Sequence, residues 1–238
     1  MRSAPDLVGR IERRVLLDHA VDPDVAARHL PPGLEVRLLD GRAVVGVCLI
    51  RLVEMRPTGL PRPLGRTIEA AAHRISVVGP GDDGPEPGVF VPRRDSRSRA
   101  AVRAGGRIWP GVHGRADITV ERRPSSLAID VACPDGAAVS VTLDLDADRP
   151  GGTALADPDA TRTFHAVERR AWSPRRGGGP ESGLEEAVLD CLPWSARPVG
   201  VTAATSTWLD DRDLFPLGSS HLAGALLMED VPVRWSAG

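Results

Sequence analysis

Residues 34–52 read LEVRLLDGRAVVGVCLIRL. The dipeptide Asp40-Gly41 lies between two apolar runs, and it is a strong signal for a two-residue hairpin turn because Asp and Gly tolerate the positive φ that such a turn requires. It predicts one strand at residues 34–38 and a returning strand at residues 42–52. The returning strand is apolar at successive positions, so both of its faces should be covered. The fold should therefore be built on an antiparallel sheet with other elements packed on each side.

Short apolar runs and turn residues continue along most of the chain. Helices are expected from Pro23, which follows the N-cap residue Asp22, to about Leu30, and at residues 158–168. Further strands are expected at residues 8–17, 66–78, 89–92, 107–109, 113–122, 126–133, 137–145, 184–190, 199–209 and 223–235, and Gly/Pro-rich loops at residues 56–65, 79–88 and 173–183. We predict a single α+β domain over residues 1–238, with a mainly antiparallel, barrel-like sheet and a few flanking helices.

The composition argues against several classes of protein. The chain of 238 residues has a net charge of -2 at pH 7, so no overall field draws it to nucleic acid or to a membrane. Its three cysteines are odd in number and form no Cys-x-x-Cys pair, which argues against a disulfide framework and a zinc knuckle. No segment resembles a signal peptide or a membrane span. We therefore expect a cytoplasmic protein without nucleic-acid or membrane partners, and the sequence leaves homo-oligomer formation open.

The chain contains no lysine. All 30 of its basic residues are arginine, and Tyr, Asn and Gln are absent as well. Arginine stays protonated in proteins, and imidazole forms no stable imine with a carbonyl compound. The backbone amine of Met1 is therefore the one primary amine in this sequence that could attack a carbonyl group.

Three segments, at residues 21–34, 88–92 and 104–116, resemble the acetoacetate decarboxylase family. The first is similar to the early helix and proline-rich exit of these enzymes, the second to one of their strands, and the third reads AGGRIWPGVHGRA. In the decarboxylases the third segment holds the imine-forming lysine. In that register His113 takes the lysine position, and Gly114 takes that of a second lysine that lowers the pKa of the first.

A closer resemblance is to a branch of uncharacterised bacterial proteins, a domain of unknown function in the acetoacetate decarboxylase-like superfamily. The phrases that carry it lie at residues 48–52, 71–75, 91–95, 213–216 and 225–232, and residues 146–200 match least. The resemblance implies an acetoacetate decarboxylase-like fold with a pocket, in a branch without the imine-forming lysine. Because Gly114 carries no charge, a lysine introduced at position 113 is expected to keep a high pKa and not to restore decarboxylation by itself.

Three residues are candidates for catalysis: His113, Glu69 and His73. A neutral His113 imidazole could act as a general base, and its protonated form could donate to an oxyanion. Glu69 and His73 share one face of a predicted strand, and the resemblance places Glu69 near a pocket glutamate of the decarboxylases. The alternatives are a solvated His113, and a Glu-His or Glu-Arg pair that satisfies the interior of the sheet.

Arginines and one tryptophan are candidates for ligand binding. Arg93, Arg94 and Arg107 lie at strand ends, and a guanidinium can bind a carboxylate or phosphate through two hydrogen bonds. Trp109 should line the same pocket. An arginine of the first strand, Arg13 or its neighbour Arg14, could also face the pocket, since the decarboxylases use an arginine near this position. The other arginines of this region, Arg97, Arg99 and Arg103, are expected on a solvated helix face.

Other chemistries find little support in the sequence. It has no Gly-x-Ser-x-Gly elbow, phosphate-binding loop, dinucleotide-binding glycine motif or His-Glu-x-x-His motif. A metal site built from Glu69, His73 and His113 would lack any regular ligand spacing, so we expect no metal and no cofactor. The arginine cluster lacks the interleaved aromatic residues of a nucleic-acid surface.

Three hypotheses follow for function. The first is an enzyme that works without an imine, as a decarboxylase, hydratase or tautomerase of a small keto acid, with arginine holding the carboxylate and His113 or Glu69 moving a proton. The second is a non-catalytic binder of an apolar or anionic metabolite, and the third is a structural partner in an assembly. A small polar pocket would favour the first hypothesis. A large apolar cavity with Glu69 directed away from it would favour the second, and a barrel filled by its own side chains with an exposed apolar patch would favour the third.

Overall fold

Five long antiparallel strands dominate the fold. The computed structural model describes all residues except 1–4, 108, 148–156, 178–182, 192 and 238. The long strands are β1 (Leu7–Val21), β4 (Arg42–Pro57), β5 (Arg66–Gly81), β6 (Gly84–Ser96) and β14 (Ser220–Ala237). In this set β1 pairs with β4, β4 with β5, β5 with β6, and β1 with β14, and every pairing is antiparallel.

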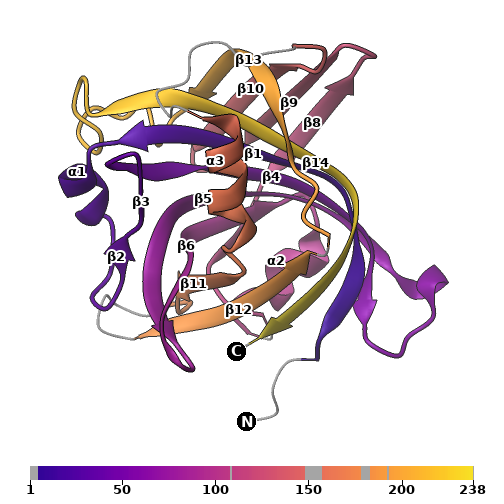
Figure 1. The fold of residues 1–238 in the computed structure, drawn as a ribbon. Helices are drawn as coiled ribbons and strands as arrows, with labels where there is room; N and C mark the ends of the chain where they lie inside the picture. Colours follow the sequence, from indigo (N-terminus) through magenta and orange to yellow (C-terminus); the bar gives the residue numbers. More distant parts are fainter. Residues whose placement is uncertain (1–4, 108, 148–156, 178–182, 192, 238) are drawn as a thin grey trace.

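Two further strands close these five into a ring. Strand β11 (Arg170–Pro174) pairs in parallel with β6 and antiparallel with β12 (Leu184–Cys191), which in turn pairs with β14. Seven strands thus follow one another in the order β1-β4-β5-β6-β11-β12-β14 and return to β1 (Figure 1). The predicted α+β fold with a mainly antiparallel sheet is confirmed, with parallel pairings of β6 to β11 and to the short strand β7 (His113–Arg115).

A second layer of strands covers one outer side of the ring. It consists of β8 (Asp117–Arg122), β9 (Ser126–Ala132), β10 (Ala138–Asp144) and β13 (Arg197–Ser206), and β13 also pairs with β14. The largest apolar core lies between this layer and the outward face of the ring, where Val45, Val47 and Leu49 of β4 pack with residues such as Ile129 and Leu143. The apolar run in β4 therefore has one face in this core and the other inside the ring, as the sequence indicated.

The helices are few and short. They are α1 (Pro23–Ala27), α2 (Arg99–Ala104), α3 (Pro158–Ala166) and a 3-10 turn at Arg62–Leu64, and the remaining strands are β2 (Glu35–Val36) and β3 (Leu38–Leu39). The Asp22 side chain accepts a hydrogen bond from the Asp24 amide and caps α1, which ends earlier than the expected Leu30. In the part of the chain that the structure describes, no helix has both the length and the apolar character to cross a bilayer.

Other sequence expectations also differ from the structure. The strand expected at residues 34–38 is divided into β2, which pairs with β5, and β3, which pairs with β4. The expected loop at residues 79–88 is mostly strand, because β5 and β6 stay hydrogen-bonded to each other up to the Gly81–Gly84 pair. The expected loop at residues 173–183 begins inside β11, and its residues 178–182 lie outside the described residues. The expected strand at residues 107–109 contains residue 108, also outside them, and Trp109 forms only an isolated bridge with Gly105.

Candidate functional site

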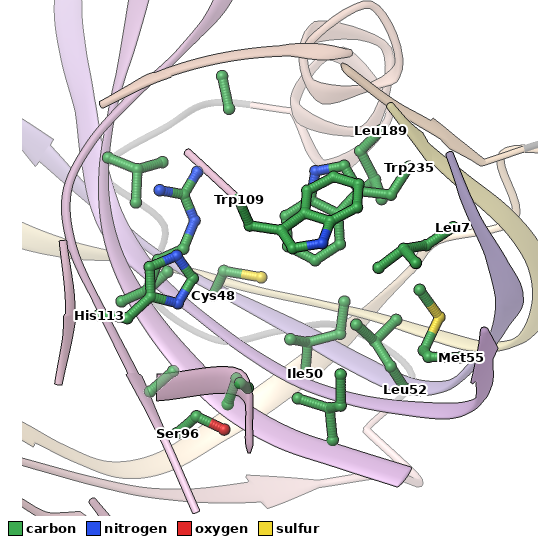
Figure 2. Close-up of a pocket in the computed structure, with 18 of the residues that line it drawn as sticks. Leu7, Cys48, Ile50, Leu52, Met55, Ser96, Trp109, His113, Leu189 and Trp235 are labelled. Carbon is green, nitrogen blue, oxygen red and sulfur yellow. The ribbon is translucent and has the colours of Figure 1, made fainter. Parts of the chain in front are cut away.

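A cavity of about 310 Å³ lies inside the ring. Every one of the seven ring strands contributes to its wall, and alanines of helix α2 cover it. Most of the lining is aliphatic or aromatic, and Figure 2 shows these side chains converging on one space. The apolar lining includes Leu7, Ile50, Leu52, Met55, Ile68, Trp109, Leu189 and Trp235.

The polar side chains of the inner cavity come from neighbouring strands. Cys48 of β4 lies opposite Ala72 of β5, Ala72 lies opposite Arg94 of β6, and Arg94 lies opposite His113 of β7. One step along the strands, Arg14 of β1 lies opposite Ile50. Pairing across the sheet therefore gathers Arg14, Cys48, Arg94 and His113 although they are far apart in the sequence.

Arg94 and Arg14 bring positive charge to the inner cavity. Arg94 is 8% exposed and donates to Ser173 Oγ at 2.5 Å, and burial lowers its pKa to about 10, so it stays charged at neutral pH. The Arg14 guanidinium lies 5.7 Å from the centre of the Trp194 ring, and its Nε is buried without a hydrogen-bond partner. Neither arginine forms an ion pair with any described carboxylate, whereas the buried Arg13 and Arg74 both do.

His113 is a neutral imidazole whose proton lies on Nε2. Its Nε2 lies 2.9 Å from the Pro110 carbonyl oxygen, so Nε2 carries the proton and donates it there. Burial is the main cause that lowers the pKa of His113, and the nearby Arg94 lowers it further. The Nδ1 atom of this neutral ring is consequently the one that can accept a proton.

A buried charged cluster lies next to these groups. His165, at the end of α3, is 2.9 Å from Asp18 Oδ2 through Nε2 and 2.6 Å from Glu168 Oε2 through Nδ1, and Arg74 contacts both carboxylates. Burial disfavours the charged form of His165, but the nearby carboxylates of Asp18 and Glu168 outweigh it and raise the pKa of His165. Burial also disfavours the charged form of Asp18, but Arg74 and His165 outweigh it and lower the pKa of Asp18 to about 2. Arg74 and Glu168 also line the cavity. The charges of this cluster balance, so Arg14 and Arg94 are the cations of the inner cavity that are left for a ligand.

The structure brings three of the predicted site residues to the cavity: His113, Arg94 and Trp109. It does not bring Glu69 or His73 there, so these two catalytic candidates do not share a cavity with His113. On β5 the residues that line the cavity include Ile68, Ala70, Ala72 and Arg74, whereas Glu69 and His73 point to the outer side.

Glu69 forms the Glu-Arg pair that the sequence left open as an alternative, and His73 packs against an aromatic ring instead. Glu69 is ion-paired with Arg13 and, at 3.0 Å, with Arg51. His73 packs edge-on against Trp208, with ring centres 5.0 Å apart, and burial lowers its pKa to about 4. The metal set of Glu69, His73 and His113 is divided between two faces of the sheet, and the described residues hold no other group that could bind a metal ion.

The predicted arginines divide in the same way. Arg93 is ion-paired with Asp95 and Asp135, and Arg107 is exposed and does not line the cavity. Arg13 is held by Glu69 on the outer side, so Arg14 is the arginine of β1 that faces the cavity.

Sequence reasoning missed Cys48 and the charged cluster altogether. The signal for Arg14 was present in the alternation of Arg14, Leu16 and Asp18 along one face of β1. Asp18 and Arg74 are charged residues inside apolar strands, and such residues are expected to be paired when buried. No local pattern pointed to Cys48, because its strand is apolar on both faces.

The fold is that of acetoacetate decarboxylase-like proteins. Acetoacetate decarboxylase from Legionella pneumophila subsp. pneumophila str. Philadelphia 1 superposes with a TM-score of 0.62 at 15% identity, over 98% of this chain and 85% of that one. An acetoacetate decarboxylase-like enzyme from Sphingomonas wittichii RW1 gives 0.59 at 16% identity, over 100% and 92%. The enduracididine biosynthesis enzyme MppR, in complex with pyruvate, gives 0.57 at 15% identity, over 100% and 89%. At these identities the likeness shows the fold alone.

The sequence also matches a family model over residues 10–225. The chain belongs to this family, DUF2071, which is described as an uncharacterized conserved protein. A comparison with curated proteins gives no significant match.

Proposed function

We propose that this protein binds a small organic carboxylate inside the ring of strands, without forming an imine. The observation that carries the proposal is the pair of cavity arginines, Arg14 and Arg94, which have no carboxylate partner among the described residues. A buried charge without a partner is costly. A carboxylate that accepts paired hydrogen bonds from a guanidinium would relieve this cost.

The character of the cavity favours binding over imine chemistry. Its volume of about 310 Å³ lies at the lower end of the range for small-molecule sites, and its wall is mostly apolar. Glu69 points away from it, and the chain supplies no lysine. The structural neighbour MppR is described in complex with pyruvate, a small carboxylate, which supports the same chemical class of ligand here.

Calorimetric titration with butyrate tests the proposal. Wild-type protein should bind butyrate but not the neutral butyramide, and Arg94→Met should bind butyrate about tenfold to a hundredfold more weakly, because it loses hydrogen bonds to a charged group. Arg103→Met, an exposed arginine of α2, is the matched control and should bind as wild type does. Unchanged binding by Arg94→Met, or no binding of butyrate, hexanoate or pyruvate by wild type, would contradict the proposal.

His113 supports a second candidate function, proton transfer on a bound keto acid. Its pKa is lowered and its Nε2 is held by Pro110, so Nδ1 can take a proton from the carbon next to a ketone. The charge of the resulting enolate would lie near Arg94, which faces His113 across the sheet. Exchange of the methylene protons of acetoacetate into deuterated water, followed by NMR, tests this. Exchange should exceed the buffer rate with wild type and fall to it with His113→Ala; equal rates would leave binding as the better account.

A further inference from the structure

The polar and apolar groups of the cavity are ordered along the axis of the ring. Along β4 the residues that face inward are Cys48, Ile50 and Leu52, and each step of two residues advances about 6.6 Å. Cys48 belongs to the row that contains Arg94 and His113, whereas Leu52 lies opposite Ile68 in an apolar row. The cavity therefore changes from cationic to apolar within two such steps.

The cationic end is the inner one. Beyond the row of Cys48 and Arg94 lies Arg74, which is buried with Asp18 and His165 in the charged cluster near the end of α3. That cluster closes the cavity with groups whose charges balance one another. An anionic group at this end would meet the guanidinium groups of Arg14 and Arg94.

The apolar end leads toward solvent. Leu7 lies opposite Trp235 and Pro57 at this end, and the ring of Trp235 lies 5.7 Å from that of Trp109. Figure 2 shows His113 and Cys48 on one side of the cavity and Leu7, Met55, Leu189 and Trp235 on the other, with Trp109 between them. Arg66, which lines the cavity next to Met55, is exposed.

From this order we infer that the ligand is an aliphatic monocarboxylate bound with its carboxylate inward, and with its hydrocarbon chain among Leu52, Met55 and Trp235. The inference rests on the proposed carboxylate binding and deepens it, because a short keto acid would leave the apolar half of the cavity unfilled. The apolar half also selects against a second charge, since a carboxylate buried among Leu52, Met55 and Trp235 would lose its hydration, and the nearby Arg66 is exposed to solvent, where an ion pair contributes little.

A series of acids tests the inference by calorimetry. From acetate through butyrate to hexanoate and octanoate, affinity should rise about fourfold for each added methylene until the cavity is filled, because burial of one methylene contributes about 0.8 kcal/mol. Adipate, which has the length of hexanoate and a second carboxylate, should bind at least about tenfold more weakly than hexanoate. Affinity that does not depend on chain length, or equal binding of adipate and hexanoate, would overturn the inference. Either result would leave Arg94-dependent carboxylate binding intact, whereas failure of all acids to bind would remove the proposed function itself.

A variant tests the direction of the chain. Ala70 lines the cavity between Ile50 and Ser96, and Ala70→Leu would occupy space in the path of a long chain. It should weaken octanoate binding at least about tenfold and leave acetate and butyrate binding close to that of wild type. Ala132→Leu, the same change at an exposed position of β9, is the control. An equal loss of affinity for acetate, butyrate, hexanoate and octanoate with Ala70→Leu would show that the hydrocarbon chain of the ligand does not run past Ala70. This result would overturn the proposed orientation.

Discussion

At the level of single residues, the surroundings of position 113 resemble those that make an amine nucleophilic. His113 is buried, and Arg94 lies beside it. Burial and a neighbouring cation both lower the pKa of an amine. These two causes do not depend on the uncharged Gly114. A second lysine at position 114 would not fit into this structure, because a Cβ atom there would lie 2.2 Å from Asp95 Oδ1.

We therefore predict that His113→Lys forms an imine with acetoacetate, in contrast to the expectation from Gly114 alone. Intact mass spectrometry after borohydride reduction should show one adduct with this variant and none with wild type away from the N-terminus. Arg103→Lys, on the exposed side of α2, is the control for a lysine with an ordinary pKa and should give no adduct. A lack of adduct with His113→Lys would mean that Arg94 and burial do not lower the amine pKa enough.

Glu69 is predicted to act in stability and not in ligand binding. It is 8% exposed and is shared by Arg13 and Arg51, so Glu69→Gln leaves the buried Arg13 guanidinium without its counter-charge. Removing one partner of a buried ion pair costs on the order of 3 kcal/mol, and urea unfolding should show a loss of this size. Glu12→Gln, which removes the more exposed partner of Arg51, should cost less than about 1 kcal/mol. Butyrate affinity should be unchanged in both variants, and a selective loss of binding with Glu69→Gln would contradict this role.

At the level of elements, helix α3 is held against the ring by a buried charged cluster that contains the titratable side chain of His165. Asp18, Glu168, Arg74 and the imidazolium of His165 form the buried cluster, and Arg37 also reaches Glu168 at 3.5 Å. The pKa of His165 is raised in the folded protein, so its contribution to stability is fully present below its unfolded pKa of about 6.5 and is lost as pH rises through the folded pKa. The carboxyl groups of Asp18 and Glu168 have lowered pKa values and stay ionised over this range.

We predict that the stability difference between wild type and His165→Gln shrinks as pH is raised from about 6 to about 9. Urea unfolding at several pH values measures it. Other histidines with lowered pKa values, such as His19 and His73, titrate in both proteins and cancel in the difference. A difference that stays constant over this range would show that His165 is neutral in the folded protein.

Strand β5 shows how far the sequence could lead. Its existence follows from its apolar and β-branched residues, but its two faces could not be told apart. Alanines occur on both faces, at Ala70 and Ala72 on one and at Ala71 on the other, and each face carries charged side chains. In the absence of a contrast between faces, Glu69 looked as well placed for the cavity as Arg74. The choice was decided by ion pairs to residues more than 50 positions away, which no local pattern encodes.

At the level of the whole molecule, the site depends on closure of the ring. Short motifs located β6, β7 and His113, since they lie within one continuous segment that resembles a known family. The opposite wall of the cavity comes from Leu7 of β1, Leu189 of β12 and Trp235 of β14. These residues meet only because the sheet returns to its first strand, and the pairing of β1 with β14 has no signature in either strand alone. The sequence therefore predicted the sheet and the residues His113, Arg94 and Trp109 of the cavity, but not the wall contributed by β1, β12 and β14.

Closure of the ring also shapes how the protein folds during synthesis. Leu7 pairs with Trp235, so one edge of β1 has no partner until residues 220–237 have left the ribosome. Contacts so distant in sequence slow folding, because loop entropy must be lost before they form. Until then the growing chain exposes a free strand edge together with apolar residues destined for the interior, a combination that promotes aggregation. The architecture that produces an enclosed cavity thus makes the nascent β1 dependent on the distant strand β14, and slower translation would lengthen the time that the chain spends in this vulnerable state.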